Sequence, residues 1–474
     1  MTTAAPAHQL VVVGGGLAGI TAALVAADAG AQVTLLEARP RLGGATFSFQ
    51  RDGLWLDNGQ HVFLRCCTAY RWLLRRLGAT DLVTLQPRLA LPVVAPGGRI
   101  GWLRRGALPL PAPLHLAGAL ARYPYLSWPQ RMRVGRAALA MRRLDPADEA
   151  NDRQALAPWL AAHGQDPGSV KALWELISLP TLNALAADSS LALALKVFKT
   201  GLLEVADAAD IGYARVPLQQ LHGDRAERAL ASAGAQFRPR SRVASIEPMP
   251  EPEGGLAVTT GEGVRLEAAA VILAVPHDGV AGLLPEAAGP ERLGALGRLG
   301  SAPIVNLHVH YDRRVTTLDF AAGLGTPVQW VFDRTAASGL DPTWRDGQHL
   351  AVSLSAADAE IDTPTAALRE RYLPALAQLF VAAAEARVVS FLVTRERTAT
   401  FRQAPGTAAL RPAARTVVPG LYLAGAWTAT GWPATMESAV RSGLVAAREA
   451  LATFGLSPRA DSEQFLTHEE VVAA

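Results

Sequence analysis

The stretch that decides the fold reads QLVVVGGGLAGITAALVAADAGAQVTLLE and runs from Gln9 to Glu37. Its first five residues are mostly apolar and β-branched, which is typical of a buried parallel strand. A glycine-rich turn follows, and small and apolar residues from 17 to 29 then predict a helix that ends at Gly30. Residues 32–36 predict a second strand. This order of strand, glycine turn, helix and strand indicates a unit that binds a dinucleotide.

The residues of the turn have separate tasks in such a unit. Gly14 permits the tight turn, Gly16 lets the backbone approach a pyrophosphate, and Gly19 lets the helix pack closely on the strand. The N–H groups and the dipole of the helix then face the phosphates. Glu37 can accept hydrogen bonds from a ribose diol and would repel a 2′-phosphate, which disfavours NADP. The predicted contacts are Gly14, Gly15, Gly16, Ala18, Gly19 and Glu37.

A second glycine pair and two arginines follow directly. The stretch EARPRLGG, from Glu37 to Gly44, resembles the FAD-dependent amine oxidases and carotenoid desaturases, which hold more of the pyrophosphate there. An NAD-binding dehydrogenase has no such need, so the stretch favours FAD. The resemblance implies further cofactor contacts by Ala38, Arg39, Arg41, Gly43, Gly44 and Ala45.

The C-terminal region supplies the second contact that a flavin needs, because the isoalloxazine lies far from the adenine. Residues 420–425 predict a short strand that ends in glycine, and Pro433 lies near the start of a helical run. Free N–H groups of that helix near Met436 would stabilise negative charge at N1 and O2 of reduced flavin. The alternative is a final helix that only closes the sheet.

Both ends together resemble the family of flavin amine oxidases and carotenoid desaturases. That family carries Gly-Asp where this chain has Gly425 and Ala426, so the aspartate that bonds the ribityl and phosphate region is missing. The family also contacts adenine through the residue equivalent to Val243, and it places the segment around His61 near the flavin. The resemblance therefore implies cofactor contacts by Gly59, His61, Val243, Gly425, Ala426 and Met436.

Four segments resemble the hydroxysqualene dehydroxylases of bacterial hopanoid biosynthesis, and this resemblance covers almost the whole chain. It implies an FAD-dependent reductive dehydroxylation: hydride replaces the hydroxyl group of hydroxysqualene, an acid helps the hydroxyl to leave, and squalene and water form. A carotenoid or phytoene desaturase that acts on a polyprenyl chain is the enzyme alternative. A lipid-binding escort protein of similar fold is the alternative without catalysis. The segments are Asp57–Val62 (DNGQHV), Pro303–His308 (PIVNLH), Gln329–Arg334 (QWVFDR) and Thr430–Glu437 (TGWPATME).

The candidate catalytic residues are His61, Asp57, Tyr213 and Arg215. His61 is the first candidate for the acid, since histidine can carry a proton near neutrality; the alternative is a hydrogen bond to backbone or flavin. Asp57 either orients His61 or caps the Asn-Gly turn that follows it, and capping is the preferred interpretation. Tyr213 and Arg215 precede a predicted helix that would border the pocket.

Two strand-like segments leave alternatives open. Asn306, His308 and His310 would share one face of a strand, and a polar face turned to solvent is the simplest interpretation. Further ligands are lacking, so we predict no metal site. Trp330 and Phe332 would either line a tunnel for a polyprenyl chain or pack in the core.

Composition and charge narrow the class of protein. Half of the 474 residues are hydrophobic, which permits a large core, and the net charge of +3 is spread along the chain, so we predict no nucleic-acid binding. Residues 104–136 either dip into a lipid headgroup layer or form a proline-rich loop and a core helix, the preferred interpretation. We expect a cytoplasmic protein, or one held peripherally at the inner face of the cell membrane. It would bind a long-chain isoprenoid and receive electrons from a reductant that the sequence does not identify.

The alternation of segments predicts an α/β fold of the amine oxidase and desaturase type. A Rossmann-like FAD-binding domain would be assembled from residues 1–88, 210–290 and 396–474. A mixed α+β substrate-binding domain, formed by residues 89–209 and 291–395, would be inserted into it.

Overall fold

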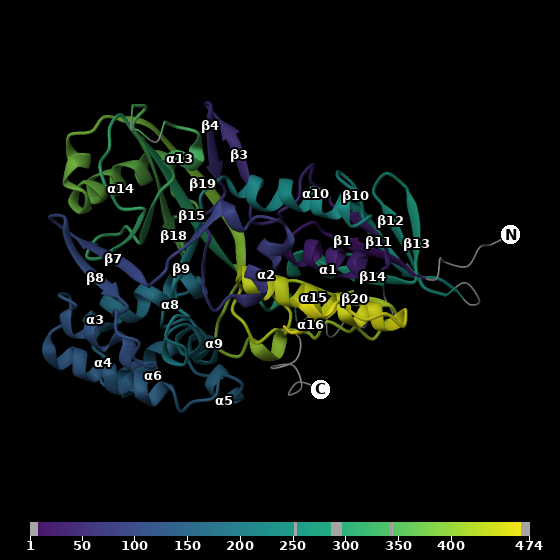
Figure 1. The fold of residues 1–474 in the computed structure, drawn as a ribbon, viewed down its shortest axis with the longest axis horizontal. Coiled ribbons are helices and arrows are strands. Elements are labelled where there is room, and N and C mark those ends of the chain that lie inside the picture. Colours follow the sequence, from purple (N-terminus) through teal and green to yellow (C-terminus); the bar gives the residue numbers. More distant parts are fainter. Residues whose placement is uncertain (1–7, 251–253, 286–295, 342, 344, 466–474) are drawn as a thin grey trace.

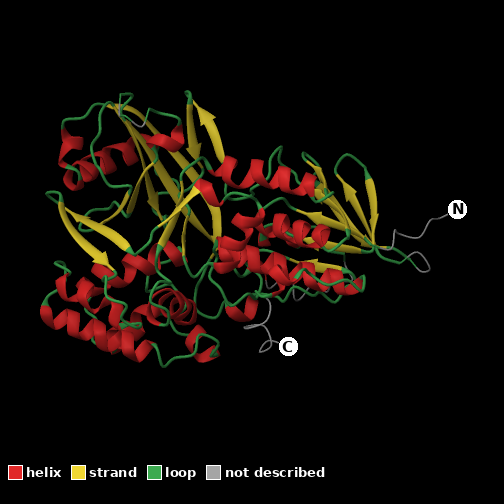
Figure 2. Ribbon diagram, viewed as in Figure 1, coloured by secondary structure: helices red, strands yellow, loops and turns green. Residues whose placement is uncertain are grey.

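The structure is a computed structural model that describes residues 8–250, 254–285, 296–341, 343 and 345–465. Of the predicted domain segments, parts of 1–88, 210–290, 291–395 and 396–474 lie outside the described residues. Figure 1 shows a parallel sheet with its helices on the right of the view and a larger sheet with several helices on the left, and Figure 2 separates helices from strands by colour.

The parallel sheet has five strands in the order β10-β2-β1-β14-β20. Helix α1 (Leu17–Asp28) connects β1 to β2, so the predicted strand, turn, helix and strand are confirmed. Helix α15 (Met436–Thr453) packs on α1 so closely that a Cβ at Gly443 would lie 2.3 Å from the carbonyl oxygen of Ala18. The strands are β1 (Gln9–Val13), β2 (Gln32–Leu36), β10 (Gln236–Arg238), β14 (Ala270–Leu273) and β20 (Leu421–Leu423).

The larger sheet has seven strands in the order β19-β15-β18-β17-β16-β7-β8. One face packs against α14 (Thr365–Leu379), because Val331 of β17 shares a hydrophobic cluster with Leu368 and Tyr372 of that helix. The opposite face packs against helices from residues 117–198. The strands are β7 (Ala90–Ala95), β8 (Arg99–Arg104), β15 (Ser301–Tyr311), β16 (Phe320–Gly323), β17 (Trp330–Asp333), β18 (Gln348–Leu354) and β19 (Val388–Phe401).

The helices on that opposite face form one hydrophobic cluster with the sheet. Phe332 of β17 and Phe320 of β16 belong to this cluster together with Trp159 and Leu195 from the helices. These helices are α3 (Ala117–Arg122), α4 (Trp128–Met141), α6 (Leu156–Ala162), α8 (Glu175–Leu182) and α9 (Leu191–Phe198).

Smaller sheets join the two large ones. The hairpin of β3 and β4 ends at Asp57, and β9 pairs with both β5 and β6 in a three-stranded sheet. A separate antiparallel sheet of order β11-β12-β13 flanks the parallel sheet. Bounds are β3 (Ser48–Arg51), β4 (Leu54–Asp57), β5 (Val62–Leu64), β6 (Val83–Leu85), β9 (Ile211–Ala214), β11 (Val243–Pro248), β12 (Leu256–Thr260), β13 (Arg265–Ala268), α2 (Thr68–Arg76) and α10 (Arg225–Ser232).

The predicted domain division remains a prediction. The strands of the parallel sheet come from the three segments predicted to bind FAD, whereas β19 runs through the predicted boundary between residues 395 and 396. Within the described ranges, no helix is both long and apolar enough to cross a membrane.

One prediction about burial is wrong. Asn306 and His308 lie on β15, which has β19 and β18 as neighbours, and their side chains are buried instead of facing solvent. The Asn306 amide donates to the carbonyl of Asn58 at 3.0 Å, and Nδ1 of His308 lies 3.3 Å from Nε2 of His349. These long-range partners pair one polar atom of each side chain, while Oδ1 of Asn306 and Nε2 of His308 stay buried without a hydrogen-bond partner among the described residues. The spacing along one strand could not reveal these contacts.

Candidate active site

The glycine turn has the geometry that the sequence predicts. A Cβ at Gly14 would lie 2.4 Å from the carbonyl oxygen of Ala274, and one at Gly19 would lie 1.9 Å from that of Gly14, so neither position admits a side chain. At Gly16 the nearest heavy atom to a Cβ is the Cα of Gly44 at 3.8 Å. Gly16 is also the N-cap of α1 and supplies no side-chain cap. The open space and the free N–H groups suit a pyrophosphate.

Glu37 is held where it can receive a ribose. One of its carboxylate oxygens accepts the N–H of Gly15 and the other accepts that of Arg39, both at 2.7 Å. Each oxygen retains acceptor capacity for a diol. The backbone of Glu37 also accepts the N–H of Ser241 at 2.8 Å, which brings β2 next to the start of β11, where Val243 is buried.

The second glycine pair lies against the first. The N–H of Gly43 donates to the carbonyl of Gly15 at 2.9 Å, and a Cβ at Gly44 would lie 2.7 Å from the Cα of Gly16. Arg41 stacks on the ring of Phe47 at 3.5 Å and donates to the carbonyl of Gly44 at 3.4 Å. Ala38, Arg39 and Ala45 are exposed beside them. Positive charge therefore borders the predicted phosphate site.

The far end is built around the start of α15. Thr435 caps this helix by accepting the N–H of Ser438, and Met436 is its first residue. The N–H of Gly425 donates to Oγ of Ser442 at 2.8 Å, and the carbonyl of Ala426 accepts from Ser438 and from Arg411, each at 3.1 Å. Both predicted ends thus lie on one parallel sheet, at the carboxyl ends of β1 and β20, where nucleotides bind in such folds. These residues fit FAD.

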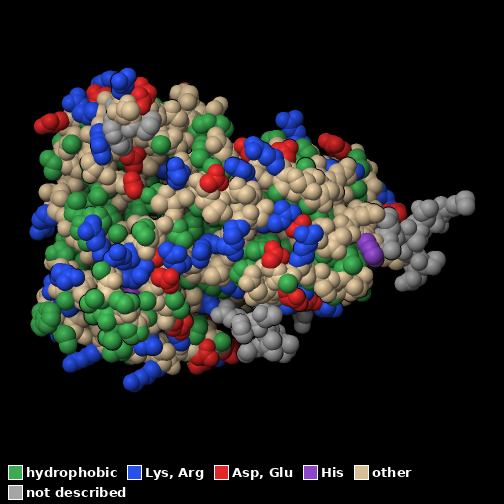
Figure 3. Space-filling view, viewed as in Figure 1, with side chains coloured by type: hydrophobic (Ala, Val, Ile, Leu, Met, Phe, Trp, Pro, Cys, Tyr) green, Lys and Arg blue, Asp and Glu red, His purple; other side chains and the backbone are tan. Residues whose placement is uncertain are grey.

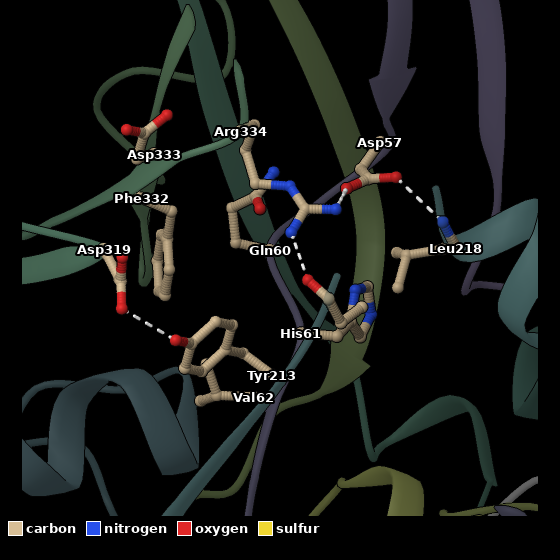
Figure 4. Close-up of a pocket in the computed structure, with 11 residues that line it drawn as sticks. Asp57, Gln60, His61, Val62, Tyr213, Leu218, Asp319, Phe332, Asp333 and Arg334 are labelled. Carbon is tan, nitrogen blue, oxygen red and sulfur yellow. Dashed lines mark hydrogen bonds and ion pairs between the residues drawn. The ribbon is translucent and has the colours of Figure 1, made fainter. Parts of the chain in front are cut away.

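A pocket lies between the smaller sheet of β5 and β9 and the larger sheet (Figure 4). Three of the four candidate catalytic residues line it, and several other polar side chains join them. The lining residues are Asp57, Gln60, His61, Val62, Tyr213, Ala214, Leu218, Asp319, Phe332, Asp333 and Arg334.

Asp57 has neither of the expected roles. One carboxylate oxygen accepts from Oγ of Ser48 at 2.6 Å and from the N–H of Leu218 at 3.0 Å, and the other lies 2.8 Å from Nη2 of Arg334. The carboxylate therefore bonds to the paired strand β3 and to two distant segments, and not to the adjacent turn or to His61. Asn58 holds the turn instead: its side chain accepts from Phe47 and donates to Ala45.

Arg334 is the functional candidate that the sequence did not single out, although it ends the QWVFDR segment. It is 8% exposed, donates to the carbonyls of Ala214 at 2.6 Å and Val216 at 3.1 Å, and keeps a buried Nε without a partner. A guanidinium has five N–H donors, and the one at Nε has no acceptor among the described residues. An arginine directly after a β-branched and aromatic strand was the one signal for it.

The ring of His61 takes up a proton less readily than an ordinary imidazole, and its catalytic role stays a prediction. Burial lowers its pKa, against the opposing effects of the Gly59 carbonyl and the Asp57 carboxylate. Nδ1 lies 3.1 Å from the carbonyl oxygen of Gly59, which can only accept, so Nδ1 carries the hydrogen. Nε2 of the neutral ring is then an acceptor.

Of the two remaining catalytic candidates, Tyr213 lies in the pocket and Arg215 lies outside its lining. Tyr213 lines the pocket and donates to Asp319 at 2.8 Å, and burial, with Asp319, raises its pKa to about 12. Its hydroxyl is therefore protonated over the neutral range. Arg215 follows the last residue of β9, is exposed and lies outside the pocket lining. Phe332 lines the pocket and belongs to a hydrophobic core cluster, whereas its place in a tunnel for a polyprenyl chain stays a prediction.

Comparison with known proteins places the chain in a class. The family of flavin containing amine oxidoreductases matches residues 17–451, and the chain belongs to this family. It is an FAD-dependent oxidoreductase with an α/β fold.

Individual relatives divide between two reactions. The chain is 27% identical over 471 residues to the 15-cis-phytoene desaturase of Narcissus pseudonarcissus, covering 95% of this chain and 80% of that one. It is 28% identical over 451 residues to the hydroxysqualene dehydroxylase of Rhodopseudomonas palustris, covering 93% and 98%. In fold it is similar to a triple mutant of putrescine oxidase, with a TM-score of 0.71, 20% identity and coverage of 94% and 99%.

Proposed function

We propose that this protein catalyses the FAD-dependent reductive dehydroxylation of hydroxysqualene to squalene in hopanoid biosynthesis. The observation that carries the proposal is the polar pocket, with the unpartnered buried Nε of Arg334 and the side chains of Gln60, His61 and Tyr213 on its lining. A hydrocarbon substrate offers these groups no hydrogen-bond partner, whereas an alcohol offers both a donor and an acceptor. The relative from Rhodopseudomonas palustris supports the same reaction.

The side chains of the pocket divide into apolar and polar surfaces. Phe332 and Val62 provide apolar contact for the isoprenoid chain next to the hydroxyl. Arg334 orients the hydroxyl oxygen as a donor, and the oxygen of Tyr213, whose own proton is donated to Asp319, accepts from the hydroxyl group. FAD, when bound in its reduced form, supplies the hydride that replaces the hydroxyl group.

His61 is the proposed proton donor. Its lowered pKa means that the protonated ring is rare at neutral pH but is a stronger acid than an ordinary imidazolium. The cation would deliver its Nε2 proton to the leaving hydroxyl, which departs as water. Rate should therefore rise as the pH falls below neutrality, whereas donation by Tyr213 would leave the rate independent of pH there.

Desaturation of a polyprenyl chain is the second candidate. The desaturase from Narcissus pseudonarcissus covers as much of the chain as the dehydroxylase does and supports this alternative equally well. The lipid-binding escort alternative has no support from these relatives, both of which are named as enzymes. Anaerobic incubation with reduced FAD and hydroxysqualene, in parallel with oxidised FAD and phytoene, distinguishes the two reactions by their products.

A further inference from the structure

Helix α4 carries an apolar stripe on its outer side. Trp128, Met132 and Leu139 are exposed, by 61%, 49% and 53% respectively, and Gly135 has open space at the position of a Cβ. These four positions follow the spacing i, i+4, i+7 and i+11, which places them on one face of a helix.

The inner side of the same helix packs in the hydrophobic core. Val134, Ala137 and Met141 are buried in the hydrophobic cluster that also contains Phe332 of the candidate active site. The preferred interpretation of residues 104–136 as a loop and core helix thus describes only half of α4. Because core packing accounts for the inner side alone, the outer stripe needs a separate explanation.

The segment that carries the stripe has charge of one sign, although Asp166 of a neighbouring segment lies 4.0 Å from Arg133 of the same helix. From Arg104 to Leu144 the sequence has eight arginines and no aspartate or glutamate. Arg136, Arg142 and Arg143 are exposed on and beyond α4, and none has an acidic partner in the part of the chain that the structure describes. Long arginine side chains can lie beside apolar residues while their guanidinium groups reach outward.

The neighbouring loop adds further apolar surface. Leu108, Leu110 and Leu114 are exposed, and Leu108 is 71% exposed. Arg131 connects α4 to the end of α3 by donating to the carbonyls of Ala121 and Tyr123. Figure 3 shows hydrophobic side chains gathered at the lower left, over α3 and α4, with Lys and Arg side chains along their margin.

We propose that the outer face of α4, with its stripe of Trp128, Met132 and Leu139 and its fringe of Arg136, Arg142 and Arg143, docks the protein on an anionic lipid bilayer. Apolar side chains would enter the headgroup layer, and the arginines would face lipid phosphates. A protein partner would need a complementary acidic and apolar surface; a second copy of this face is disfavoured, because its arginines would repel each other. The docking does not rest on the proposed reaction.

Flotation of the FAD-loaded enzyme with lipid vesicles tests this inference. Vesicles contain either phosphatidylcholine alone or equal parts of phosphatidylcholine and phosphatidylglycerol. We expect binding to the mixed vesicles that falls at an ionic strength of about 1 M, where the Debye length is about 3 Å. The stripe variant Trp128→Ser/Met132→Ser/Leu139→Ser should lose about tenfold or more in partitioning. The fringe variant Arg136→Gln/Arg142→Gln/Arg143→Gln should lose a similar factor on mixed vesicles only.

Matched controls change equally exposed residues elsewhere. Val264→Ser/Val417→Ser and Arg228→Gln/Arg265→Gln/Arg369→Gln should float like the parent protein, and flavin absorbance reports that each variant is folded. Absence of the parent protein from the floating fraction, or unchanged partitioning of the stripe variant, would overturn the proposal. Self-association in solution that the stripe variant abolishes would also overturn it, because a second copy would then cover this face.

Discussion

Asp57 and Arg334 form a buried ion pair, with 2.8 Å between Oδ2 and Nη2 and side-chain exposures of 6% and 9%. Asp57 ends β4, and Arg334 follows β17, so the pair joins a hairpin near the predicted FAD site to the seven-stranded sheet. The same two side chains line the candidate active site. The pair therefore links the stability of the fold to the shape of the pocket.

Breaking this pair should be costly. Asp57→Asn leaves the guanidinium charge buried without its carboxylate, and we expect the free energy of unfolding to fall by about 3–5 kcal/mol. Urea denaturation of the purified protein measures it. The control is Arg397→Gln, which removes an exposed pair with Asp362 and should cost under about 1 kcal/mol. If both substitutions lowered the free energy of unfolding equally, the buried pair would contribute no more to stability than the exposed pair does.

The sequence predicted the parts of the site that are local. The strand, turn and helix around Gly14 and Gly19 follow from residues within one short stretch, and the structure confirms them. Arg334 was not singled out, because its partners Ala214 and Asp57 lie more than a hundred residues away. The spacing of Asn306 and His308 indicated a shared strand face, but not that both faces of β15 are buried, because packing against distant segments decides burial.

Adding a methyl group at two glycines of the turn should have different effects, one on folding and one on FAD binding. Gly19→Ala would place its Cβ 1.9 Å from the carbonyl oxygen of Gly14, so we expect loss of folded protein. Gly16→Ala meets no protein atom closer than 3.8 Å, so the apoprotein should keep its stability while FAD binding weakens. Denaturation of apoprotein and titration with FAD measure the two effects.

Gly135→Ala, in open space on α4, is the control and should stabilise the helix by up to about 1 kcal/mol. Unchanged FAD affinity in Gly16→Ala would contradict the placement of the pyrophosphate beside this residue.

Buried histidines should make stability depend on pH. Burial lowers the pKa of His308 from 6.5 to about 4 and that of His222 from 6.5 to about 3. The unfolded chain therefore takes up these protons first, and stability falls as the pH drops from about 6.5 towards about 4, by at most about 1.4 kcal/mol per pH unit for each histidine.

Urea denaturation between these pH values should show a flatter dependence for His308→Gln than for the parent protein. A slope that His308→Gln does not alter would mean that this ring takes up its proton over the same pH range in the folded and the unfolded protein.

His61 has a test that separates chemistry from cofactor binding. His61→Ala should abolish squalene formation while the protein keeps its bound flavin, and in the parent protein the rate should rise as the pH falls below about 6.5, because burial lowers the pKa of this ring. Tyr213→Phe is the companion variant and tests donation by the hydroxyl that bonds Asp319. Unchanged turnover in His61→Ala would remove this residue from the mechanism and leave Tyr213 as the donor.

The most direct test of the proposed reaction is product analysis after anaerobic incubation of the purified, FAD-loaded and reduced protein with hydroxysqualene. We expect squalene and one oxidised flavin for each hydroxyl group lost, and no desaturated product from phytoene with oxidised flavin. Recovery of unchanged hydroxysqualene together with desaturation of phytoene would contradict the proposed dehydroxylation. The polar pocket would then have a different function.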